Sequence, residues 1–481
     1  MSQVLSYTKE QSSWRSPTLE LLNLALPNIG MTISRMLMGF IDFYMVSHLG
    51  TAAQAAITPC TMLLFVIACT GMGMSQGVQT FVSQADGRKE PHVAGGYVWQ
   101  TLFLSLIACV ISLPIAWFVP QWFSIAARFN QHEPDVMAME IAFLKFSLWS
   151  IGPMTACAGL EAFYNGIRRP MIALTGTLAS LVTITVVNYV LIFGKFGFPA
   201  MGIAGSGIAT LAAWVVRLII LLIPFGWEAI DQRYHTRRSF GLSLVKLREI
   251  LVVGSPIAFQ WLVDIGAWVV FMQMMIPPFG AVQMAAATIA FQFMHLSFMP
   301  AVGVGVALTT QVGNAIGAGA PDEAMMRVRV ARRLIVAYMG LMMFVFVFLG
   351  GPIAGLACFE TNPQLRSAVI SAAATVLIWV SIFQIPDALC IVYSFASRGA
   401  GDTRVPSLLF AVCCWGIFVP GGWFMARYVP SFGVNGPWMM CTTYITVLSV
   451  LLWRRFHSEK WRDIRIFSKE QTPAEALPIG G

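Results

Sequence analysis

The chain has 481 residues, of which 57% are hydrophobic and only 11% are charged. A soluble domain usually carries about 25% charged residues, so this composition excludes an ordinary soluble protein. The formal net charge is +8, but the basic residues fall between long apolar stretches, so we expect no nucleic-acid binding. Together these features predict a multi-pass helical membrane protein.

Charged residues, prolines and glycines divide the chain into twelve apolar stretches, each about 20 residues or longer, the length that crosses a bilayer as a helix. Several are longer than needed, which predicts tilted helices or helices that extend beyond the bilayer. The stretches lie near residues 18–47, 53–83, 93–120, 137–165, 170–194, 200–225, 249–276, 283–314, 334–358, 367–396, 406–426 and 433–453.

Lysine and arginine are unevenly divided between the segments that connect these stretches. With both termini in the cytoplasm, 23 of the 30 basic residues fall in cytoplasmic segments. The four on the other side are Arg128, Lys195, Arg366 and Arg427, and the three inside stretches are Arg35, Lys145 and Arg217. The positive-inside rule therefore places both termini in the cytoplasm, and we expect the protein in the inner (plasma) membrane of the cell.

The two halves of the chain resemble each other in sequence. Matching features stand 229 to 236 residues apart: Pro27 and Pro256, Thr80–Gly87 and Thr310–Gly317, Asn165–Pro170 and Gly401–Pro406. Six spans per repeat would start each half on the same side of the membrane, so the repeats are parallel and related by an axis along the membrane normal.

The predicted fold is therefore an all-α membrane protein whose twelve transmembrane helices form two parallel-repeat six-helix bundles around a V-shaped cleft. We expect the N-terminal bundle at 18–226, a cytoplasmic linker at 227–248, the C-terminal bundle at 249–455 and a cytoplasmic tail at 456–481. The tail after Lys469 is predicted to be disordered, because it lacks the apolar residues that would fold it.

Three carboxylates interrupt apolar stretches: Asp42 in the first, Asp264 in the seventh and Asp387 in the tenth. Facing lipid, three such groups would cost roughly 7–10 kcal/mol, so we expect them to face the bundle interiors or the cleft as ion or substrate sites. Asn188 in the fifth stretch is a neutral polar group of the same kind, although an interhelical hydrogen bond would also explain it.

Arg35 stands seven residues before Asp42, two turns away on one face of the same helix. By the repeat it also occupies the position of Asp264, since each follows its proline by eight residues. Arg35 could pair with either carboxylate and compete with a bound cation, and we hypothesise that it tunes the site. The alternative is an arginine that snorkels from a tilted helix.

Enzyme signatures are absent from the sequence, which contains no P-loop, HExxH or CxxC motif. We therefore expect no enzymatic activity and no bound cofactor. Transport by such a chain would draw on an ion gradient, since one charge moving through about 100 mV releases about 2.3 kcal/mol.

Several segments resemble those of one transporter family. These are GFIDFYMVSHLG at 39–50, PIAFQWLVD at 256–264, QVGNAIGAG at 311–319, FQIPDA at 383–388 and RGAGDTR at 398–404. The chain resembles the multidrug and toxic compound extrusion (MATE) transporters, particularly the NorM-like branch, over roughly residues 18–455. The branch usually has glutamate at the position of Asp264.

The resemblance implies a transporter that exports amphipathic, often cationic compounds by antiport and alternating access, as a monomer. It implies coupling to sodium or protons through Asp387 and Asp264, and a polar cluster around Asp42 and Asn188. Ser206 falls near an expected hydroxyl ligand, and Thr210 is a weaker candidate on the same stretch. Many members carry a second asparagine where this chain has Ile184, so sodium is expected at Asp387 and Asp264 first.

Two other functions remain open at this point. A related flippase for a lipid-linked precursor would need a basic cleft, which the acidic residues argue against. A channel is the alternative from a different class, and single-channel conductance would separate it from a transporter.

Overall fold

The computed structural model describes residues 16–126, 134–358, 360 and 362–467, and in these ranges it contains helices and no β-strand. The expected disorder after Lys469 and the basic residues Lys9 and Arg128 lie outside the described residues.

Sixteen α-helices follow one another along the described chain, joined by short 3₁₀ and π turns. Their bounds are α2 Pro17–Ser47, α3 Thr51–Gln76, α4 Val78–Gly87, α5 Ala94–Ala126, α6 Pro134–Ser147, α7 Ile151–Gly166, α8 Pro170–Phe193, α9 Ile203–Phe225, α10 Glu228–Tyr234, α11 Leu244–Val270, α12 Ala281–Gly317, α13 Pro321–Ala357, α14 Pro363–Ala400, α15 Arg404–Cys413, α16 Val419–Tyr428 and α17 Asn435–His457.

Twelve helical segments of the described chain are long and apolar enough to cross a membrane, one for each predicted stretch. This confirms the predicted all-helical membrane fold. The largest difference in bounds is at α13, which begins at Pro321 rather than near residue 334. A proline is favoured in the first turn of a helix, and the basic segment after it stays helical, so α13 extends well beyond the apolar stretch.

Local sequence signals explain several helix ends. The Ser16 side chain accepts a hydrogen bond from the backbone N–H of Leu19 at 3.3 Å, and Asn362 accepts from two backbone N–H groups at the start of α14. Side-chain oxygens at these positions satisfy N–H groups that have no partner inside the helix. Helix α14 ends at Gly401, whose φ of +83° is a left-handed conformation that suits glycine.

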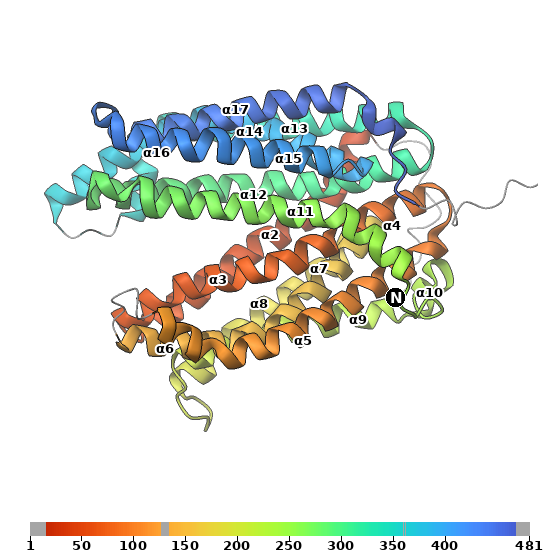
Figure 1. Cartoon of the computed structure of the whole chain (residues 1–481), viewed down its shortest axis with the longest axis horizontal. Coiled ribbons are helices and arrows are strands. Elements are labelled where there is room, and N and C mark those ends of the chain that lie inside the picture. Colours follow the sequence, from red (N-terminus) through yellow and green to blue (C-terminus); the bar gives the residue numbers. More distant parts are fainter. Residues whose placement is uncertain (1–15, 127–133, 359, 361, 468–481) are drawn as a thin grey trace, which may run out of the picture.

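The helices form two groups that lie side by side (Figure 1). We call α2–α9 the N-half and α11–α17 the C-half. The halves meet where α2 packs on α12 and α3 packs on α11. A Cβ added at Gly303 would lie 2.8 Å from the backbone nitrogen of Ile29, and one added at Gly73 would lie 2.6 Å from the Cα of Ala258. Small residues therefore let the two halves approach at backbone distance.

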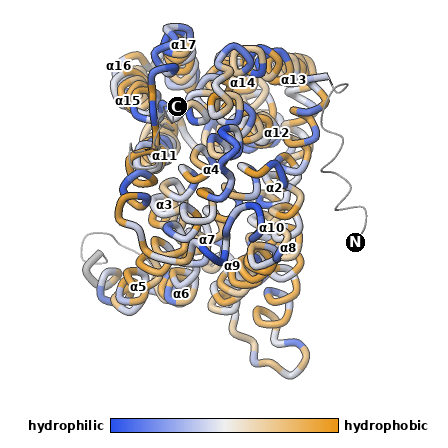
Figure 2. The backbone as a smooth tube through the Cα atoms, turned by 90° about the vertical axis from the view of Figure 1, so that its right-hand side faces the viewer, coloured by the Kyte–Doolittle hydropathy of each residue, from blue (hydrophilic) through white to orange (hydrophobic). Residues whose placement is uncertain are grey.

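Contacts between the halves are dense at one end of the molecule, which we call the linker end because it carries α10. Here α4 packs against α12 and α14. The Gln79 amide donates to Thr310 Oγ1 at 2.9 Å, and the Thr80 hydroxyl donates to the backbone carbonyl of Arg398 at 2.8 Å. Figure 2 looks onto this end, where hydrophilic segments gather around α4 and α10. Towards the opposite end, the far end, the two groups of helices diverge (Figure 1).

The segment between the halves is folded against α5. The Trp99 indole N–H donates to the backbone carbonyl of Thr236 at 2.5 Å, and Gln100 donates to the carbonyl of Gly241 at 2.9 Å. The backbone N–H of Arg237 donates to the Asp231 carboxylate at 2.6 Å, and this bond lowers the pKa of Asp231. Helix α11 begins at Leu244, five residues before the predicted C-terminal bundle, and the predicted domain bounds stay a prediction.

The chain after α17 crosses from one half to the other at the linker end. Trp461 is only 1% exposed and is part of the C-half core, whereas Ile466 and Phe467 pack against the core of the N-half. We call residues 460–467 the tail segment. It joins the two halves a second time, far in sequence from the link through α10.

Candidate functional site

Asp42 lies inside the N-half, where three helices meet. It is 6% exposed, and one of its carboxylate oxygens, Oδ1, accepts two hydrogen bonds. Asn188 Nδ2 on α8 donates at 2.8 Å, and Ser206 Oγ on α9 donates at 2.6 Å. Asn188 and Ser206 are fully buried, and Asn188 Oδ1 has no hydrogen-bond partner among the described residues. The structure therefore brings together three predicted site residues from three spans.

Thr210 follows Ser206 by one helical turn on α9, so it lies on the same face of the helix. It is partly buried, and no described hydrogen bond joins its side chain to Asp42. The predicted role of Thr210 in this cluster therefore has no contact to support it.

An apolar layer lies below Asp42 towards the linker end. It contains Met38, Ile184, Ala209 and Ala213, all less than 9% exposed. Ile184 takes the place where many MATE proteins would have an asparagine, and here its side chain completes this layer. The layer separates Asp42 from a second polar group.

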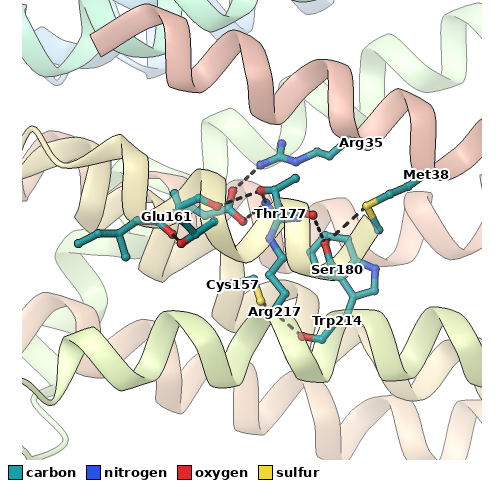
Figure 3. A network of polar contacts seen from close by, with 11 residues as sticks. Arg35, Met38, Cys157, Glu161, Thr177, Ser180, Trp214 and Arg217 are labelled. Carbon is teal, nitrogen blue, oxygen red and sulfur yellow. Dashed lines mark hydrogen bonds and ion pairs between the residues drawn. The ribbon is translucent and has the colours of Figure 1, made fainter. Parts of the chain in front are cut away.

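This second polar group is an ion-pair cluster of Arg35, Glu161 and Arg217, which we call the Arg–Glu–Arg cluster (Figure 3). Arg35 on α2 pairs with Glu161 Oε2 on α7, and Arg217 on α9 pairs with Glu161 Oε1 at 2.5 Å. Arg217 Nη2 also donates to Thr177 Oγ1 on α8 at 2.7 Å, and its guanidinium lies 5.0 Å from the ring centre of Trp214. One carboxylate thus bridges two arginines within the membrane span.

The expected pairing of Arg35 with Asp42 or Asp264 is wrong, because its described partner is Glu161. The spacing of Arg35 and Asp42 does place them on one side of α2. However, the Met38 layer lies between them, and Asp42 is already bonded by Asn188 and Ser206. The hypothesis that Arg35 tunes the site and its alternative, a snorkelling arginine, both stay predictions.

The C-half holds the other two acids. Asp387 on α14 is 5% exposed, and its Oδ2 atom has no hydrogen-bond partner among the described residues. Asp264 on α11 is close enough to interact with it electrostatically, and it lies beside the indole of Trp268. Gln384, one turn before Asp387, donates to Ser297 Oγ on α12 at 3.0 Å. The two predicted C-half residues therefore share one region, with an unpaired carboxylate oxygen in it.

Both acidic sites offer oxygen atoms to a small cation. Acceptors without a partner among the described residues include Asp387 Oδ2 and Gln384 Oε1 in the C-half and Asn188 Oδ1 in the N-half. Sodium and protons are bound by such oxygens, whereas zinc prefers nitrogen and sulfur ligands. Among the described residues, no group of three or more His, Cys, Asp and Glu side chains could hold a metal ion.

Sequence reasoning missed the role of Glu161 and gave Arg217 no specific partner. The available signal was that two arginines and a glutamate lie within uncharged spans, where unpaired charges are expensive. Their pairing joins residues 126 positions apart, which helical spacing alone does not predict.

Comparison with known proteins identifies the family of the chain. The MatE family model matches residues 27–190 and 256–424, more than half of the chain in two separate segments. A protein of Rhizobium meliloti described as a probable multidrug resistance protein NorM is 27% identical and covers 94% of this chain and 96% of its own length. A protein of Xanthomonas axonopodis with the same description is 30% identical, with 91% and 93% covered.

A solved structure described as MATE in complex with MaL6 superimposes with a TM-score of 0.84 at 18% sequence identity. The match covers 94% of this chain and 98% of that one, so the two proteins share the whole fold. Sequence, family model and fold agree over nearly the full length of the described chain. The chain belongs to the MatE family.

Proposed function

We propose that this protein is a cation-coupled antiporter that exports amphipathic, often cationic compounds through the inner membrane. The relatives named above are described as multidrug resistance proteins, which supports small-molecule cargo and a transporter rather than an enzyme. The coupling ion is sodium or a proton, and the protein acts as a monomer.

The linker end is proposed to be the cytoplasmic end. Both termini are predicted to be cytoplasmic, and 20 of the 23 basic residues expected on that side lie in described segments, which this end carries. The described contacts between the halves are dense at this end, and the halves diverge towards the other (Figure 1). This arrangement fits a state that is closed to the cytoplasm and open to the outside, from which cargo leaves.

The observation that carries the proposal is the unpaired Asp387 Oδ2 atom next to Asp264 inside the membrane span. Two carboxylates at one level repel each other when both are charged. A sodium ion or proton relieves that repulsion and favours a more tightly packed arrangement of the C-half. A ligand shifts such an equilibrium only by its differential affinity for the two states, so binding at these acids is coupled to the conformation.

The Asp42 cluster offers a second cation site in the N-half. Asn188 Nδ2 and Ser206 Oγ both donate to the charged carboxylate, which stabilises it in place, and Asn188 Oδ1 remains as an acceptor. Having two cation sites increases the driving force available for exchange. Exchange of one cation for one monovalent cationic cargo cancels the electrical term, so a second ion restores the contribution of the membrane potential.

Asp387→Asn is expected to abolish coupled efflux, because the neutral amide can neither bind the cation tightly nor release a proton. Purified protein in vesicles should lose dye efflux driven by sodium or pH gradients to the level of empty vesicles, a fall of roughly tenfold or more for a lost charged contact. The measurement is dye efflux with the sodium and pH gradients imposed separately, which also identifies the coupling ion.

Asp135→Asn is the matched control, because Asp135 is exposed at the start of α6 and belongs to neither acidic site. It should transport like the wild type. Normal efflux by Asp387→Asn under both gradients would refute coupling through the C-half acids, and ionic current without cargo exchange would indicate a channel instead.

A further inference from the structure

The Arg–Glu–Arg cluster carries one more positive than negative charge. Arg217 is fully buried and is bonded to both Glu161 and Thr177, so its charge is held in place. Glu161 is shared between the two arginines, which leaves about one positive charge without a described counter-ion. The Nε atoms of Arg35 and Arg217 also lack hydrogen-bond partners among the described residues. An unpaired positive charge within a membrane span is energetically costly, and an anionic partner would reduce that cost.

The exposed part of this cluster is Arg35, and it does not face lipid. Its side chain is 38% exposed. The lipid-exposed face of α2 is marked by Ile33 and Leu37, at 45% and 44% exposure. Residues two apart on a helix point about 200° apart, so Arg35, two residues from each, lies on the opposite face.

Beside Arg35, the surface of α2 changes from covered to open between Thr32 and Gly39. Thr32, about one turn before Arg35, donates to the backbone carbonyl of Met299 on α12 at 3.4 Å. Gly39, one turn after Arg35, is exposed, and a Cβ added there would meet no atom within 4 Å. Arg35 therefore lies between a described contact with α12 and an uncovered position on α2.

We propose that Arg35 is a binding subsite for a carboxylate group on the exported compound. A guanidinium offers paired N–H donors that match a carboxylate, and one surplus positive charge matches one negative charge. The acids of the C-half would take the cationic group of the same molecule. The inference rests on the proposed export function and narrows its cargo to amphipathic compounds that carry a carboxylate besides a cationic group.

Two dyes that differ only at this group provide the test: rhodamine 110, with a free carboxylate, and its methyl ester, rhodamine 123. Arg35→Gln should weaken binding of rhodamine 110 by roughly tenfold, the usual effect of losing a charged hydrogen bond, and binding of rhodamine 123 by less than twofold. Arg35→Lys should lie in between. The readouts are Kd from fluorescence anisotropy of purified protein and KM of efflux from vesicles.

Arg35→Gln leaves the neutral Arg217–Glu161 pair intact, so the fold should tolerate it. Equal losses for both dyes would indicate a structural role and overturn the subsite, as would no loss for either. Binding of both dyes without any driven efflux would instead contradict the proposed transport function. Failure of the Arg35 subsite can therefore be distinguished from failure of the proposed transport function.

A different observation supports a second inference, at the end of the tail segment. Phe467 packs edge-on against the rings of Phe81 and Tyr97, with ring centres 5.7 and 6.0 Å apart, and the Arg88 guanidinium lies 4.2 Å above the Phe467 ring. All three partners belong to the linker end of the N-half. At the other end of the segment, Trp461 is buried in the C-half, so the tail segment connects the two halves.

We infer that the tail segment is a strap that holds the linker end closed. Opening this end would separate α4 from α12 and α14, and Phe467 would have to leave its aromatic contacts or the tail would have to leave the C-half. Ile466 strengthens the connection, because it packs directly on Gly401, where a Cβ would clash with it.

Phe467→Ala in the full-length protein tests the strap. Amide hydrogen exchange in segments 79–87 and 310–317, where the halves meet, should rise roughly tenfold, since an aromatic pair and a cation–π contact are lost. Phe348→Ala is the control, because Phe348 is 73% exposed on α13. Exchange at these segments equal to the wild type would overturn the strap, whereas faster exchange throughout the chain would show general loss of stability.

Discussion

Glu161 is the residue on which the charge balance of the N-half depends. It is the one described carboxylate in contact with Arg35 and Arg217, and Arg217 has no exposure to water. An arginine fully buried in a membrane span is tolerated here because its counter-ion is at 2.5 Å and a hydroxyl and an indole ring surround it. Removal of the acid would leave two like charges facing each other.

Glu161→Gln is therefore expected to destabilise the protein by roughly 3–5 kcal/mol, the usual cost of an uncompensated buried charge. Arg217→Gln should cost less, because it leaves the Arg35–Glu161 pair. The double variant should be more stable than Glu161→Gln alone. Thermal unfolding in detergent measures all three, and equal unfolding temperatures for Glu161→Gln and the wild type would contradict the prediction.

At the scale of elements, glycines set how closely the helices of the two halves approach. Gly87 at the end of α4 and Gly317 at the end of α12 each face the backbone of the other helix. A Cβ on Gly317 would clash with the Gln84 carbonyl, and a Cβ on Gly87 would clash with the Asn314 carbonyl. Backbone atoms cannot move aside as a flexible side chain would, so these two positions control closure of the linker end.

Gly317→Ala should destabilise the closed linker end by roughly 1–3 kcal/mol, the usual cost of overpacking. Exchange of amides in segment 79–87 should increase, and dye efflux should slow. Gly351→Ala on α13 is the matched control, because a Cβ there meets nothing within 4 Å. Unchanged exchange and efflux in Gly317→Ala would show that the two helices do not need to meet at this distance.

At the scale of the whole molecule, the sequence was sufficient to predict that the chain forms twelve membrane-spanning helices. Apolar length and the positions of prolines and glycines decide these features locally. Helix ends were less predictable. Pro321 opens α13 well before its apolar stretch, because a charged segment outside the membrane can continue a helix.

The candidate sites were predicted in part. Asp42, Asn188 and Ser206 were each recognised as polar groups in apolar spans, and the structure places them in hydrogen-bond contact. The partner of Arg35 could not be read from spacing, because spacing reports neighbours on one helix only. Its contact with Glu161 depends on how α2 and α7 pack, and four α-helices, α3 to α6, separate them in sequence.

The apolar layer of Met38, Ile184, Ala209 and Ala213 has a consequence for how ions move. The Ser180 hydroxyl reaches this layer from the cluster side, donating to Met38 Sδ at 3.6 Å and to the Thr177 carbonyl at 2.7 Å, but no described hydrogen bond continues from it to Asp42. A proton on Asp42 therefore has no described hydrogen-bond path to the cluster below. We therefore expect a proton or ion bound at Asp42 to be separated from the linker end by this layer. In the proposed antiporter, an ion at Asp42 would leave towards the linker end only after the surrounding helices rearrange, so exchange with cargo would not be accompanied by a free leak of ions.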